Sequence, residues 1–197
     1  MGFRTRFWIS AISLAVLGVL AIPVGGSSAS VTAAYSCNLI MPGKTYTYVT
    51  AELISGQAGV ASYKPGAPVA LVDWSAKVVF PKAVVNALTK YTTTVTGTVT
   101  VFKISGSDVS PTVVNAAGAG ISIGTVKLVA NKAATVQIPA APITVSGWKA
   151  ASTPGTIALS TGKVKIDLVV TVQGSPVLMP VTCAPDPSAT IATSTVS

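Results

Sequence analysis

The most regular strand pattern in the chain runs from residue 163 to residue 183 and ends at a cysteine. Polar residues separate apolar side chains at alternate positions, namely Val164, Ile166, Leu168, Val170 and Val172. A period of two predicts a strand with one face in a core and the other in water. Gly174, Ser175 and Pro176 then predict a turn, after which a second short strand leads to Cys183.

Cys183 has one candidate partner within the chain, because Cys37 is the only other cysteine. A bridge between them would close nearly the whole domain and would contribute at most about 5 kcal/mol in the loop-entropy model. The chain contains no histidine, which disfavours a metal site or an activated thiol at either cysteine. The sequence therefore predicts a structural disulfide that joins the two ends of the domain, as exported proteins allow.

The N-terminus has the pattern of a secretory signal. Arg4 and Arg6 precede an apolar run that gives way to Gly, Ser and Ala residues. Cleavage after Ala29, Ala33 or Ala34 would leave a small residue at the cut, and we assign residues 1–34 to the signal. An uncleaved membrane anchor is the alternative, although the apolar run is short for a span. We expect a secreted protein, extracellular or associated with the cell wall, with no membrane contact after signal removal.

Composition favours a single domain made of strands. Residues 35–185 are assigned to this domain, and residues 186–197 to a flexible Ser/Thr/Ala tail. Hydrophobic residues make up 50% of the chain and charged residues only 9%, which is the reverse of a disordered composition. The apolar runs are short and rich in β-branched residues, as strands are.

The chain in order predicts about nine or ten short strands and one helix. Alternation marks strands over residues 45–54 and 92–104, where Gly97 indicates a bulge or a close backbone approach. Pro139 and Pro142 bracket an edge-like segment, and Thr161 with Gly162 predicts a turn. A short helix is expected over residues 81–88. The fold class is all-β, an antiparallel immunoglobulin-like β-sandwich, with a small β-barrel as the alternative.

Several short motifs resemble a secreted actinobacterial domain of unknown function, of the type common in Streptomyces-like bacteria. The matching features span residues 35–185 and are Tyr35-Ser36-Cys37, the loop Pro65-Gly66-Ala67-Pro68, the helix from Pro81 to Leu88, Val95-Thr96-Gly97, Gly162 and Pro180-Val181-Thr182-Cys183. The resemblance implies an exported β-sandwich. It implies no activity, cofactor or catalytic residue.

The residues of this chain give little support for a catalytic function. Without histidine, the usual triads and histidine-based acid–base pairs are unavailable. The acids lie far apart in sequence, namely Glu52, Asp73, Asp108, Asp167 and Asp186. We interpret them as surface and turn residues and predict no catalytic residue, no cofactor site and no metal site.

Binding is the better-supported class. Without Arg4 and Arg6 the chain carries eleven lysines against five acids, a net charge of +6. Lysines spread singly favour diffuse attraction to anionic cell-wall polymers over nucleic-acid recognition. Glycans are the other candidate partner, through a ligand surface formed by Trp74, Trp148, Tyr46 and Tyr48, although tryptophans serve equally well in a core. Self-association is expected if a strand edge is bare.

These observations together predict a secreted or envelope-associated non-enzymatic module for adhesion or structural association with cell-wall polymers. The alternatives are an extracellular hydrolase or inhibitor with a site built from loops, or a carbohydrate-binding module that uses exposed aromatic side chains.

Overall fold

The computed structural model describes residues 27–197 and is an all-β fold with one short helix. About 70% of the described residues lie in strands. The strands are β1 (Ser27–Met41), β2 (Lys44–Ala58), β3 (Ser62–Tyr63), β4 (Pro68–Phe80), β5 (Thr94–Gly106), β6 (Val109–Ser110), β7 (Val113–Asn115), β8 (Ile121–Ser122), β9 (Val126–Lys127), β10 (Ala134–Ala150), β11 (Gly155–Val172), β12 (Ser175–Pro185) and β13 (Thr190–Val196), and the helix is α1 (Lys82–Leu88).

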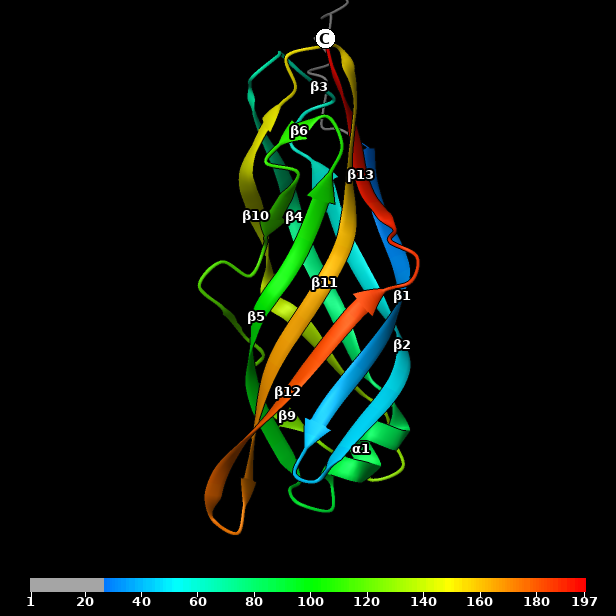
Figure 1. Cartoon of the computed structure of the whole chain (residues 1–197), viewed down its shortest axis with the longest axis vertical. Helices are drawn as coiled ribbons and strands as arrows, with labels where there is room; N and C mark the ends of the chain where they lie inside the picture. The colour runs from blue at the N-terminus through cyan, green and yellow to red at the C-terminus, as the bar shows by residue number, and fades with distance from the viewer. Residues whose placement is uncertain (1–26) are drawn as a thin grey trace, which may run out of the picture.

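The long strands form one strongly bent antiparallel sheet that packs against itself. Its order is β3-β13-β11-β12-β1-β2-β4-β10-β6, and β5 pairs with the other edge of β11. In Figure 1, β5, β11 and β12 lie in front of β4 and β10. The strands β5 and β10 do not pair with each other in the described part of the chain, so the sheet is not closed into a barrel. The predicted antiparallel sandwich is confirmed, and the barrel alternative is wrong.

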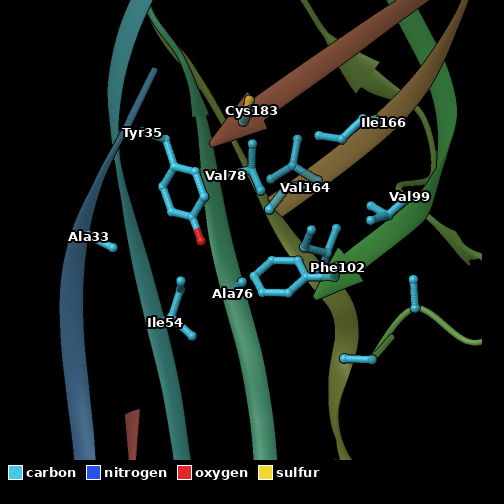
Figure 2. Close-up of a cluster of buried hydrophobic side chains, with 14 of the residues drawn as sticks. Ala33, Tyr35, Ile54, Ala76, Val78, Val99, Phe102, Val164, Ile166 and Cys183 are labelled. Atoms are coloured by element: carbon cyan, nitrogen blue, oxygen red, sulfur yellow. The ribbon is translucent and has the colours of Figure 1, made fainter. Parts of the chain in front are cut away.

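The core lies between the two layers of this bent sheet. Trp74 of β4 meets Phe102 of β5 edge to face, with ring centroids 4.8 Å apart. Figure 2 shows the neighbouring apolar side chains converging from both layers, with Ala76 and Val78 on one side and Val164 and Ile166 on the other. Most inward positions of the long strands are apolar, with Thr50, Glu52, Thr161 and Ser194 as the buried polar exceptions, so burial largely follows the period of two seen in the sequence.

The strand predicted from residue 163 is part of β11, whose buried residues include Val164, Ile166, Leu168 and Val170. The turn to β12 is also confirmed, and Gln173 and Gly174 both have positive φ there. The predicted turn at Thr161 and Gly162 is wrong. Strand β11 continues through it with a register irregularity, because Gly162 lies against the backbone of Lys103 and Thr161 exchanges two hydrogen bonds with Ala189.

Three further local predictions are confirmed. Helix α1 begins after Pro81 and buries Val84, Val85, Ala87 and Leu88. At Gly97, a Cβ atom would lie 2.6 Å from the carbonyl oxygen of Asp167, which is the close backbone approach expected there. Strand β10 runs through Pro139 and Pro142 along an edge of the sheet, where a missing N–H is tolerated.

The N-terminal boundary of the domain lies earlier than predicted. Residues 28–34 pair with residues 51–57 of β2, and Ala33 is buried in the core. Residues 27–34 therefore belong to β1 and not to a segment preceding the domain. Residues 1–26, which carry most of the predicted signal, lie outside the described residues.

The predicted flexible tail over residues 186–197 is wrong. Strand β13 pairs with β11, β1 and β3, and its side chains Ile191 and Ala192 are buried. The hydroxyl of Ser194 donates hydrogen bonds to the carbonyl oxygens of Val60 and Ala61. The small residues of this segment resemble a low-complexity tail in sequence, yet in β13 they largely alternate between buried and exposed positions.

Candidate functional site

The aromatic residues proposed as a ligand surface do not form one. Trp74 and Trp148 are 0% and 1% exposed, so both are core residues and this prediction is wrong for them. Tyr46 and Tyr48 are half-buried and pack against the core, and the ammonium group of Lys44 lies 4.5 Å from the Tyr46 ring centre. A flat stacking platform for a sugar ring needs exposed aromatic faces, and these four residues do not supply it.

The predicted disulfide is confirmed. Cys37 of β1 and Cys183 of β12 are direct cross-strand partners and are bonded to each other across 146 residues of sequence. They are 0% and 2% exposed. A bridge buried this deeply beside paired strands holds the two ends of the fold together, which is the structural role predicted for it.

An uncompensated carboxyl group lies in the core beside this disulfide. Glu52 of β2 pairs with Ala33 of β1 and points inward in phase with Thr50 and Ile54. It is 0% exposed, and neither carboxyl oxygen has a hydrogen-bond partner among the described residues. Burial disfavours the charged form and raises the pKa of Glu52 to about 8, so this side chain is largely protonated at neutral pH.

The surroundings of Glu52 are mostly apolar. Its carboxyl group lies within 4.8 Å of both disulfide sulfurs. Tyr35, whose hydroxyl donates to the carbonyl oxygen of Gly162 at 3.2 Å, points into the same interior (Figure 2). Burial, and then the charge of Glu52, raises the pKa of both Tyr35 and Tyr48. Because the two sulfurs are bonded to each other, Glu52 is the only group of the three with a free ligand atom, and one carboxylate does not make a metal site.

From the sequence, Glu52 is interpreted as one of several scattered surface and turn acids, so its burial is not predicted. The alternation in β2 could have indicated this burial, because Glu52 lies on the same face of the strand as Ile54, an apolar residue expected in the core. In the folded structure this carboxyl group has no contact with solvent.

Three of the four aspartates have side-chain partners. Asp73 accepts a hydrogen bond from the Gln57 side-chain amide, Asp108 accepts one from the backbone N–H of Thr156, and Asp167 forms an ion pair with Lys165. These three aspartates lie on different elements: Asp73 is in β4, Asp108 is in the turn between β5 and β6, and Asp167 is in β11.

Lysines gather at the end of the molecule that carries α1. Five of the eleven are found there: Lys44 in the β1–β2 hairpin, Lys82 and Lys90 at the two ends of α1, Lys127 of β9, and Lys132 in the loop before β10. Asn86 and Asn131 hydrogen-bond to each other and hold that loop against α1. Figure 1 shows α1, β9 and the β1–β2 hairpin together at this end. None of the four aspartates belongs to these segments.

A groove of about 560 Å³ opens between the segment containing β9 and the first part of β10. Its lining includes Ile123, Val126, Lys127, Thr135, Gln137 and Ala140. The lining combines apolar side chains with hydroxyl, amide and ammonium groups and contains no carboxylate. This groove lies beside the lysine-rich end and was not predicted, because it depends on which strand edges meet.

Within residues 27–197, no helix is both long enough and apolar enough to cross a membrane.

The fold and these features define the chain as an all-β domain closed by one buried disulfide. No family model matches it, and no curated protein matches it. It is similar to a solved structure described as a "putative membrane anchored protein" from Corynebacterium diphtheriae, with 17% identity and a TM-score of 0.48. That similarity covers 87% of this chain but only 38% of the other, so the chain spans well under half the length of the protein it matches.

Proposed function

We propose that this protein is a non-enzymatic module of the cell envelope or extracellular space that associates with anionic cell-wall polymers. The supporting observation is the separation of charge between surface and interior. All eleven lysines lie outside the core, five of them at the α1 end, while the side chain of Glu52 is buried and largely uncharged at neutral pH. The surface therefore carries eleven positive charges against four aspartates.

Lysine suits this partner class. Its ammonium group is a flexible point charge that attracts repeating phosphate or carboxylate groups without requiring one fixed geometry. Attraction of this kind is screened by salt, because the Debye length shortens from about 10 Å at 0.1 M to about 3 Å at 1 M. The proposal therefore predicts association that is strong at low salt and largely lost at 1 M.

A matched pair of triple variants tests the role of the α1 end. Lys82, Lys90 and Lys132 are changed to Gln in the first protein, and Lys64, Lys103 and Lys149, which lie away from that end, are changed to Gln in the second. Both lose three charges. We expect the first variant to lose much more sedimentation with purified cell wall at low salt than the second. Equal losses would contradict a localised surface, and no binding by the wild-type protein would remove the proposal.

A further inference from the structure

The groove beside β9 lies between two strand edges that have no strand partner within residues 27–197. Over residues 134–138, β10 pairs only with β4, and its pairing with β6 is confined to residues 149–150. On the other side, β9 pairs only with β5. The gap between them is the place where the bent sheet fails to close.

Bare edges present rows of backbone N–H and C=O groups that pair readily with another extended chain. The free edge of β10 from Ala134 to Ile138 spans five residues, or about 16 Å at roughly 3.3 Å per residue. An added strand would hydrogen-bond to this edge and would extend the sheet from β10 toward β9. This mode of recognition, in which backbone pairing gives affinity and side-chain pockets give specificity, is strand addition.

The two faces of the groove fix the pattern of the added strand. Inward side chains on both sides are apolar, with Ile123 and Val126 on one side and Val136 on the other, each 8% exposed. Outward side chains are polar and exposed, with Lys127 on one side and Thr135 and Gln137 on the other. Because strand side chains alternate between faces, the complementary partner has apolar residues at every second position.

The charge around the groove favours particular residues at the positions between the apolar ones in the added strand. Lys127 lines the groove, Lys132 lies one residue before the lining residue Ala133, and no carboxylate lines it. Opposite charges on neighbouring strands stabilise pairing, and like charges oppose it. We propose that this groove binds an extended segment of a partner protein in which apolar and acidic residues alternate.

A second copy of this chain fits the groove less well. The chain has only five acids, and the single acid within its most regular alternating segment, Asp167, is already paired with Lys165 on the outer face of β11. A partner rich in alternating acids complements Lys127 and Lys132, whereas a copy of this lysine-rich chain repels them. This inference is independent of the polymer association proposed above and shares no substituted residue with its test.

Three labelled peptides of about eight residues test the proposal by fluorescence anisotropy. The first alternates Val and Glu, the second alternates Val and Lys, and the third repeats the first sequence with alternate backbone amides N-methylated. We expect only the first to bind. Equal binding of the first and third peptides would overturn the proposal, because it would show charge attraction without backbone pairing. Failure of the first peptide to bind at millimolar concentration would also overturn it.

Three protein variants with exposed substitution sites locate the binding, two in the groove lining and one control beside it. Lys127→Glu should weaken binding of the Val–Glu peptide roughly tenfold. Ala140→Trp should block the groove, whereas Ala141→Trp, at a neighbouring exposed position outside the lining, should leave binding unchanged. If all three variants, once shown to be folded by circular dichroism, bind as the wild type does, the peptide binds elsewhere and the proposal is wrong.

Hydrogen exchange identifies the pairing directly. The peptide should slow exchange of backbone amides within residues 134–138 that do not already pair with β4. Unchanged exchange there in the presence of saturating peptide would contradict strand addition. If those amides are already protected in the free protein and the protein is dimeric by sedimentation equilibrium, the occupant is a second copy, and the acidic partner is refuted.

Discussion

Replacing the ionisable carboxyl group of Glu52 should flatten the pH dependence of the free energy of unfolding. In the unfolded chain this carboxyl group titrates near its ordinary pKa of 4.5, whereas burial raises the folded-state pKa to about 8. Between these values the folded state binds more protons than the unfolded state, so the free energy of unfolding falls as pH rises. The stabilising effect is complete below pH 4.5 and is lost as pH rises through 8.

The size of the effect follows from the two pKa values. A difference of about 3.5, at about 1.4 kcal/mol for each pKa unit, corresponds to a loss on the order of 5 kcal/mol between pH 4.5 and 8. Glu52→Gln keeps the shape of the side chain but cannot ionise. We therefore expect the variant to lose this slope, and to become more stable relative to the wild type as pH increases.

Urea denaturation of the oxidised protein from pH 4.5 to 9 measures the effect, with tryptophan fluorescence as the readout. Asp186→Asn serves as the control, because Asp186 is exposed and its loss should leave the slope of the wild type intact. If Glu52→Gln and the wild type show the same dependence on pH, the buried carboxyl is not protonated in the folded state and the reasoning fails.

Three further predictions concern the fold. Replacing both Cys37 and Cys183 by Ala should lower the free energy of unfolding by up to about 5 kcal/mol, and the oxidised wild type should show no titratable thiol in a native thiol assay. Ile191→Ala in β13 should lower the free energy of unfolding by about 2–5 kcal/mol in urea denaturation, whereas Thr195→Ala on the exposed side should lower it far less. Equal small effects would indicate that residues 186–197 are a flexible tail after all. Gly97→Ala should lower the melting temperature in calorimetry, because its Cβ would lie 2.6 Å from the Asp167 carbonyl oxygen, and an unchanged value would show that β5 shifts freely.

Strand identity was predictable because it depends on local alternation. The residues from Val164 to Val170 are buried every second position, as their sequence indicates, and the helix over residues 82–88 follows from apolar residues at helical spacing after Pro81. The disulfide was predictable by elimination, since Cys37 and Cys183 have no other partner in the chain. These features require no knowledge of how distant strands are ordered.

The candidate site was not predictable in the same way. Trp74 and Trp148 fit either a core or a surface, and only the bend of the sheet over Phe102 decides that Trp74 is buried. The groove depends on β9 and β10 being neighbours without being paired, which is a property of topology. The C-terminal strand was missed because Ala192 and Ser194 are too small to produce a visible apolar pattern.

The boundary at residue 34 failed for a related reason. Small residues before Tyr35 suit a cleavage site, but small residues at alternate positions also suit a strand, and Ala33 is buried opposite Glu52. Composition alone does not separate the two interpretations. Pairing with β2 does, because β2 continues to Ala58, well beyond the partner of Tyr35.

Sedimentation of the wild-type protein with three insoluble fractions tests the proposed function most directly. The fractions are purified cell wall, the same wall stripped of its anionic polymer, and an insoluble neutral glycan, each at 0.05 M and 1 M salt. If the lysines bind anionic polymer, the protein should bind the intact wall at low salt, and binding should be lost when the anionic polymer is removed or salt is raised. Binding to the stripped wall or the glycan that persists at 1 M salt would contradict it.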